Sequence, residues 1–129
     1  PKILVTGLNP HAGEDGMLGS QDDDIIKPVI LKMQKKDIYI DGPMPADTAF
    51  LKKNVKKYDI ILTMYHDQGL PVIKFNNFKK TVNVTLGLPI TRVSVDHGTA
   101  LDLVGTGNID ISSFLEAIKV AKSISNAKT

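Results

Sequence analysis

Cysteine is absent from this chain of 129 residues. That absence excludes a disulfide framework and any chemistry that depends on a thiolate. No apolar run approaches the roughly 18 residues of a membrane-spanning helix, and no signal-peptide pattern precedes the first apolar segment. We therefore expect a cytoplasmic protein that has no membrane partner.

Aromatic residues make up only 5% of the chain, and the net charge is only +2. The aromatic residues are too few to alternate with the lysines of the densest basic group, Lys52 to Lys57. Nucleic-acid binding is therefore a poor interpretation. The usual nucleotide motifs are also missing, because neither G-x-G-x-x-G nor a P-loop occurs. Gly105-Thr106-Gly107 on its own is a weak signal.

An initiator methionine is lacking too, since Pro1 and Lys2 lead straight into the apolar segment 3–6. We expect the chain to be a piece of a longer protein. Its length and its 42% apolar and 23% charged residues suit one compact domain with a real core. No repeat or linker divides it, so we expect a single α/β unit over residues 1–129.

Apolar runs and helical periodicities alternate along the chain. Strands are predicted at 3–6, 37–40, 60–64, 81–88 and 92–95. Helices are predicted from about residue 20 to 33, from 46 to 55 and from 112 onward, the last capped by Ser112 or Ser113. Segment 41–45 fits a turn or an extended link, and segment 69–75 fits either a short helix or an extended segment. The alternation indicates an α/β fold with a largely parallel or mixed sheet.

Three consecutive aspartates, Asp22 to Asp24, open the first predicted helix. We interpret them as solvent-exposed charges that suit the positive end of the helix dipole. A metal site is the weaker interpretation, because consecutive helical positions point in different directions. Pro28 either kinks this helix or marks its true first turn.

All three histidines, His11, His66 and His97, occur in polar stretches that follow apolar runs. In α/β proteins such stretches emerge at the carboxyl ends of strands, where sites are built. Histidine is a common metal ligand, and a catalytic metal needs about three protein ligands and one open position. A structural hydrogen-bonding role is the alternative for each of them. The long loop 7–19 is likewise either functional or a mobile surface loop.

Arg92 is the only arginine of the chain, and it lies between Thr91 and Ser94 in a predicted strand. A guanidinium in that setting suits a phosphate, which it binds through two parallel hydrogen bonds. Lys74 and Asn83 fall near the same suspected site. For Lys74 and Lys79 the alternative is a solvated surface position.

Four long motifs occur in order along the chain. They are Gly7-Leu8-Asn9-Pro10-His11-Ala12-Gly13-Glu14, Gly42-Pro43-Met44-Pro45-Ala46-Asp47-Thr48, Met64-Tyr65-His66-Asp67-Gln68-Gly69-Leu70-Pro71 and Ser94-Val95-Asp96-His97-Gly98-Thr99-Ala100-Leu101. Together they closely resemble the 4-hydroxythreonine-4-phosphate dehydrogenase family, and the resemblance covers essentially the whole chain. Members of that family are considerably longer, and this sequence is similar to their C-terminal part.

The resemblance implies a fold like that of isocitrate and isopropylmalate dehydrogenases, with three layers, α/β/α. The chain would cover mainly the dimer-forming lobe and the C-terminal helix, within a homodimer whose active site lies at the subunit interface. The implied reaction is the oxidation, with decarboxylation, of a small phosphorylated amino acid in pyridoxal phosphate (vitamin B6) biosynthesis. NAD or NADP and a divalent metal (zinc, magnesium or cobalt) would be the cofactors.

The resemblance also assigns roles to residues. His11 and His66 match two metal ligands, and the third family ligand would lie outside this chain. Lys74, Asn83 and Arg92 match positions that bind the phosphorylated substrate. The positions that the resemblance assigns to cofactor binding are His97, Gly98, Thr99 and Asp110. Asp67 and Lys74 are the candidates for catalysis, and Asp47 lies inside a motif with a possible supporting role.

Two other functions stay open. One is the oxidation of a different phosphorylated hydroxy acid, such as threonate or erythronate 4-phosphate. The other is a non-catalytic module that dimerises and binds metal or phosphate. We also expect this chain alone to be inactive, because one metal ligand and much of the cofactor lobe are missing from it.

Overall fold

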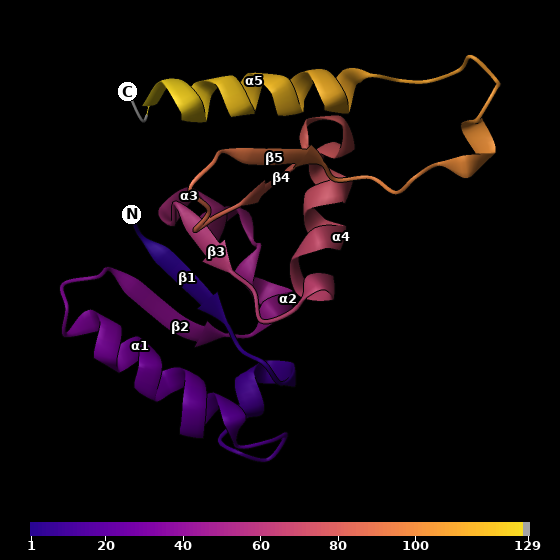
Figure 1. Cartoon of the computed structure of the whole chain (residues 1–129). Helices are drawn as coiled ribbons and strands as arrows, with labels where there is room; N and C mark the ends of the chain where they lie inside the picture. Colours follow the sequence, from indigo (N-terminus) through magenta and orange to yellow (C-terminus); the bar gives the residue numbers. More distant parts are fainter. Residues whose placement is uncertain (128–129) are drawn as a thin grey trace. The chain divides into compact units, whose positions relative to one another are not determined.

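The computed structural model describes residues 1–127, and its chain forms two compact units, residues 1–72 and the residues from 73 onward (Figure 1). Unit 1 holds a parallel sheet of β1 (Ile3–Thr6), β2 (Ile40–Met44) and β3 (Ile60–Leu62) in the order β2-β1-β3. β1 is the central strand, and its side chains are accordingly the most buried, with Leu4 fully enclosed. The predicted α/β class is confirmed.

Helices cover both faces of this sheet. Successive residues of a strand point to opposite faces, and the core divides accordingly. Val5 packs with Ile30 of α1 (Lys27–Gln34) and with Ile40. On the other face Leu4 packs with Ala49 of α2 (Ala46–Ala49) and with Tyr58, which follows α3 (Lys52–Lys57). Unit 1 therefore has the expected order of layers, α/β/α.

The first helix begins with a π-helical turn, Asp22–Ile26, that runs into α1. Pro28 lies in the first turn of α1, directly after the π-helical turn, and a proline lacks the N–H of a regular helical hydrogen bond. The second predicted helix is two helices, because Leu51 has an extended backbone with ψ of 143°. The Asn54 side chain donates to the Thr48 carbonyl at 2.9 Å and so satisfies the end of α2.

The predicted strand 37–40 was wrong, and of the two alternatives for 41–45, a turn or an extended link, the structure shows the extended one. Asp37 lies in a left-handed turn with φ of 58°, and the strand instead runs from Ile40 to Met44 through Gly42 and Pro43. A Cβ on Gly42 would lie 2.4 Å from the Val5 carbonyl oxygen, so only glycine allows β2 to approach β1 this closely. Pro43 is tolerated because β2 is an edge strand.

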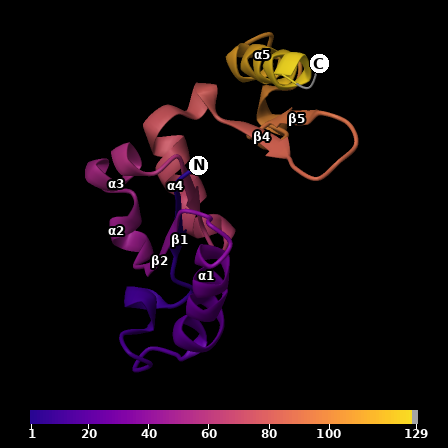
Figure 2. The same cartoon turned by 90° about the vertical axis from the view of Figure 1, so that its left-hand side faces the viewer.

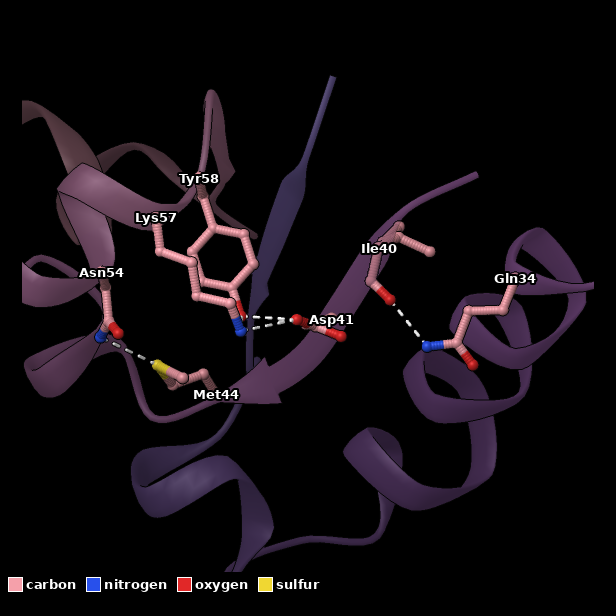
Figure 3. Close-up of polar contacts among 7 residues, drawn as sticks. All are labelled: Gln34, Ile40, Asp41, Met44, Asn54, Lys57 and Tyr58. Carbon is pink, nitrogen blue, oxygen red and sulfur yellow. Dashed lines mark hydrogen bonds and ion pairs between the residues drawn. The ribbon is translucent and has the colours of Figure 1, made fainter. Parts of the chain in front are cut away.

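A polar cluster joins α3 to β2 (Figure 3). The Tyr58 hydroxyl donates to the Asp41 carboxylate at 2.6 Å, and the Lys57 ammonium donates to the Tyr58 oxygen at 2.7 Å. The hydrogen bond from Tyr58 lowers the pKa of Asp41, whereas burial raises the pKa of Tyr58. The cluster therefore holds Asp41 ionised and Tyr58 neutral.

Unit 2 contains a hairpin of β4 (Val82–Thr85) and β5 (Arg92–Val95), and a long helix, α5 (Ser112–Ala127). α5 contacts both strands (Figure 2). The last predicted strand and the last helix are confirmed, while strand 81–88 is shorter than predicted. Segment 69–75 is helical, within α4 (His66–Asn77), which passes from unit 1 into unit 2. No helix within residues 1–127 has the length and apolarity to cross a membrane.

We predict that Tyr58→Phe destabilises the protein by about 1 kcal/mol, because a hydrogen bond to a charged group is lost at a partly exposed position. The stabilisation from Asp41 is present above its ordinary pKa of about 4 and is lost as the pH falls through its lowered value. The difference in urea unfolding between wild type and variant should therefore shrink below about pH 4. Tyr39→Phe is the control, and an equal loss in that variant would contradict the account.

Candidate functional site

His11 and His66 lie at the carboxyl edge of the parallel sheet. β1 and β3 are adjacent and parallel, so the segments that follow them leave the sheet at the same edge. His11 lies in the 3-10 turn Pro10–Gly13 with a left-handed φ of 53°, and His66 is the first residue of α4. The structure thus places both histidines where the sequence led us to expect a site.

The buried carboxamide of Gln68 joins the two segments. Its oxygen accepts from the Thr6 hydroxyl at 2.7 Å and from the Met64 backbone N–H at 2.8 Å. Its nitrogen donates to the Gly7 carbonyl at 2.7 Å. One side chain of α4 therefore fixes the ends of β1 and β3, from which the loops that carry His11 and His66 begin.

Asp22 fixes the loop that contains His11. Its carboxylate accepts from the backbone N–H groups of Leu8 and Asn9 at 2.7 and 2.9 Å, and the residue is completely buried. The prediction of a solvent-exposed charge was therefore wrong for Asp22. The reason lies in Gly7, where a Cβ would lie 2.7 Å from the Ala12 Cα; without it the loop folds back onto Asp22.

His66 carries a partner that suits a metal ligand. Its Nδ1 lies 2.6 Å from Asp67 Oδ1. When Asp67 accepts the Nδ1 proton, the Nε2 lone pair of His66 is free to bind a metal, which is a common arrangement at metal sites. A hollow of about 360 Å³ beside His11 is lined by acidic side chains as well, namely Glu14, Asp15 and Asp23.

The imidazoles of His11 and His66 are of the right chemical type to bind a divalent metal, but two ligands are too few for a catalytic site. Imidazole nitrogens suit zinc, cobalt and similar ions, and a catalytic site uses about three protein ligands. Within residues 1–127, however, no group of three histidine, aspartate or glutamate side chains is placed to hold a metal. The described residues therefore show two imidazoles on segments at one sheet edge and no complete metal site.

Unit 2 presents a polar face on its hairpin. Asn83 pairs with Ser94, and Thr85 pairs with Arg92. Residues that pair directly across an antiparallel ladder share one face of the sheet. The intervening valines, Val82, Val84, Val93 and Val95, share the opposite face. The predicted substrate-binding residues Asn83 and Arg92 therefore lie on one surface, next to two hydroxyl side chains.

Lys74 lies beside an acidic residue that sequence reasoning missed. Its Nζ is 3.6 Å from Asp96 Oδ2, and both side chains are partly buried. The Asp96 oxygen is enclosed and has no hydrogen-bond partner among the described residues. Lys74 is thus not a freely solvated lysine, because a carboxylate holds it near the end of β5.

A cavity of about 630 Å³ in unit 2 brings together the four predicted cofactor-binding residues. His97, Gly98, Thr99 and Asp110 all line it. Its other lining side chains are largely apolar, namely Phe78, Ala100, Leu103, Val104 and Ile109. An apolar hollow with a few polar groups is typical of sites for small molecules and cofactors.

Asp110 is held in place at the edge of this cavity. It forms an ion pair with Lys79 at 2.7 Å and accepts from the Ser112 backbone N–H at 2.9 Å. These contacts, first the one from Lys79, hold the pKa of Asp110 well below its usual range. Lys79 is therefore part of the cavity wall, and Asp110 satisfies the start of α5 that we had expected a serine to cap.

The fold and the edge of its sheet define a class, the α/β proteins that build sites where parallel strands end. The chain belongs to the family of the pyridoxal phosphate biosynthetic protein PdxA, whose model matches residues 1–121.

Relatives that bear the name 4-hydroxythreonine-4-phosphate dehydrogenase are similar over almost all of this chain. The protein of Methylococcus capsulatus is 53% identical over 128 residues, which are 99% of this chain and 39% of the relative. That of Acidithiobacillus ferrooxidans is 55% identical over 124 residues, 96% of this chain and 37% of the relative. The chain thus spans less than two-fifths of the length of the curated relatives it matches.

Solved structures agree with this grouping. The 4-hydroxythreonine-4-phosphate dehydrogenase of Klebsiella pneumoniae has a TM-score of 0.81 at 42% identity, over 94% of this chain and 37% of that one. A terephthalate 1,2-cis-dihydrodiol dehydrogenase of Burkholderia xenovorans has a TM-score of 0.69 at 33% identity, over 94% and 38%. The fold is therefore shared by dehydrogenases named for different substrates.

We predict that Gln68→Leu destabilises the protein by roughly 3 kcal/mol, because several buried polar groups lose their partner at once. Gln21→Leu is the matched control, since Gln21 is exposed and only accepts from the Asn9 side chain. Urea unfolding of both variants measures the difference. Similar losses in the two would show that the Gln68 carboxamide does not hold the sheet edge.

We also predict that Lys79→Met raises the pKa of Asp110 toward the ordinary value of about 4, since the ion pair is the largest cause of its lowered value. A carboxyl-carbon NMR titration measures it. Lys80→Met, at the neighbouring position, should leave it unchanged. An Asp110 that titrates normally in wild type would rule out the ion pair.

Proposed function

We propose that the protein to which this chain belongs catalyses the oxidation, with decarboxylation, of 4-phosphooxy-threonine in pyridoxal phosphate biosynthesis. The observation that carries the proposal is the identity of 53 to 55% with proteins named 4-hydroxythreonine-4-phosphate dehydrogenase, over nearly the whole chain. Unit 1 would supply part of a metal site, and unit 2 would supply contacts to the substrate and the cofactor.

His11 and His66 would hold the divalent metal together with a third ligand from outside this chain, and a homodimer is the arrangement we propose for completing the site. When bound, the metal and NAD or NADP supply Lewis-acid and hydride-accepting chemistry. Asp67 Oδ1 lies 2.6 Å from His66 Nδ1; by accepting the Nδ1 proton it would leave Nε2 of His66 available to the metal. We propose zinc, magnesium or cobalt as the ion.

Asn83, Arg92 and Lys74 would bind the substrate and its phosphate. A phosphate dianion is held best by a guanidinium fork together with neutral donors, and the polar face of the hairpin offers both. The Lys74 Nζ lies 3.6 Å from Asp96 Oδ2, and Lys74 is, with Asp67, a residue that we propose for moving a proton. Oxidation of the substrate hydroxyl gives a 3-oxo acid, which loses carbon dioxide readily.

His97, Gly98, Thr99 and Asp110 would bind the adenine end of NAD or NADP. Their common cavity is apolar enough to take a flat base. The His97 Nδ1 donates to the Gly98 carbonyl at 3.0 Å, which leaves Nε2 as an acceptor for an amino group.

The test is the formation of NADH by the full-length protein from 4-phosphooxy-threonine with a divalent metal. We predict turnover that falls at least 100-fold in His66→Asn, a loss expected when a metal ligand is removed. His97→Asn is the matched control, because it should raise the KM for the cofactor and leave metal binding unchanged. Turnover without added metal in a metal-free preparation would contradict the proposal.

A second substrate separates the proposal from its alternative. Oxidation of threonate or erythronate 4-phosphate in preference to 4-phosphooxy-threonine would assign the protein to another phosphorylated hydroxy acid. The dihydrodiol dehydrogenase of Burkholderia xenovorans makes this comparison necessary, since that similar structure is named for a different substrate. The 129-residue chain alone should be inactive; turnover by it would refute the idea that the site needs residues from elsewhere.

A further inference from the structure

We propose that Thr85 is a positioning residue for Arg92, and that its hydroxyl orients the guanidinium toward a phosphate. The inference rests on the proposed function insofar as that phosphate belongs to the substrate. Its basis is one contact: Arg92 Nη1 donates to Thr85 Oγ1 at 2.7 Å.

The register of the β4–β5 hairpin favours this contact between Thr85 and Arg92. Thr85 lies directly opposite Arg92 in the β4–β5 ladder, so both side chains rise from the same face at the closest cross-strand spacing. A β-branched residue has a stiff first side-chain angle, and the Thr85 hydroxyl therefore stays in place. Arg92 is exposed and long, and without such a contact its guanidinium would sample many rotamers.

The number of N–H donors on the guanidinium explains how the contact with Thr85 favours anion binding. A guanidinium has five N–H donors, and one Nη1 hydrogen is committed to Thr85. The Nε–Nη2 edge is left free for a bidentate contact with an anion. Because Thr85 accepts from Arg92, its own O–H remains a donor that can serve the same anion.

The partner that holds Arg92 is a neutral hydroxyl, and this matters for anion binding. None of the ion pairs among the described residues includes Arg92; the carboxylates that form them pair with lysines or with His66. A carboxylate tether would offset the positive charge that a phosphate dianion needs, whereas a hydroxyl fixes the orientation and keeps the full charge. A threonine at this position is thus better suited to anion binding than an acidic residue.

The experiment compares three variants of the full-length protein. Thr85→Val has nearly the same shape but lacks the hydroxyl, and Thr85→Ser keeps the hydroxyl. Thr81→Val is the matched control, because the Thr81 hydroxyl donates to the Asn77 carbonyl at 2.8 Å, away from Arg92. All three substitutions are compatible with a strand or its flank.

Inorganic phosphate, titrated by calorimetry, is the first probe. We expect Thr85→Val to weaken phosphate binding about tenfold, the cost of roughly one oriented charged hydrogen bond. Thr85→Ser should stay within about threefold of wild type, and Thr81→Val should be unchanged. Equal phosphate binding by wild type and Thr85→Val would overturn the inference, whatever the protein catalyses.

Turnover is the second probe, and it separates positioning from a structural effect. With 4-phosphooxy-threonine, Thr85→Val should raise KM about tenfold and leave kcat within about twofold. With 4-hydroxythreonine, which lacks the phosphate, the variant should match wild type. Equal losses on both substrates would mean that Thr85 only supports the hairpin. A wild type that binds phosphate more tightly than Thr85→Val does, but oxidises neither substrate, would contradict the proposed function and leave the Thr85 inference supported.

Discussion

The buried carboxamide of Gln68 is the contact on which the sheet edge of unit 1 depends. A carboxamide enclosed by protein must satisfy both its donor and its acceptor groups, because an unpaired buried polar group is costly. Gln68 does so with Thr6, Gly7 and Met64, which belong to the ends of two neighbouring strands. The loop of His11 and the start of α4 at His66 are therefore fixed by the same side chain.

The alternation of side chains along β4 and β5 gives the hairpin of unit 2 an apolar face and a polar face. One face of the hairpin consists of valines, and α5 contacts the hairpin. The other face carries Asn83, Arg92 and the hydroxyls of Thr85 and Ser94. Because a strand alternates strictly, a shift of register by one residue would exchange the two faces. Such a shift would therefore break up the arrangement that we propose for phosphate binding.

Much of this was predictable from local pattern. The strands 3–6 and 92–95 and the helix from Ser112 were correct, since the strands are short segments rich in β-branched residues and the helix has a clear helical apolar period. β2 was not, because Gly42 and Pro43 fit a turn as well as an extended link, and the close approach to Val5 that favours the strand is a tertiary contact. The break at Leu51 was missed because no apolar period marks it; it is accompanied by a side-chain hydrogen bond from Asn54 to the Thr48 carbonyl.

In the candidate site, too, some residues could be predicted from local sequence and others could not. The histidines, Asn83, Arg92 and the residues around His97 could be named from their motifs. Their supports could not: Gln68, Asp22, Thr85 and Asp96 act through contacts with residues distant in sequence or across a strand pair. Asp22 was read as exposed because nothing local to it indicates a loop that folds back.

The central claim is that the carboxyl edge of this sheet forms part of a metal site. An anomalous difference map from crystals of the full-length protein loaded with cobalt tests it most directly. The account predicts a peak about 2.1 Å from one imidazole nitrogen of His11 and from one of His66. A bound cobalt that contacts neither histidine, in crystals that also show the sheet edge ordered, would contradict it.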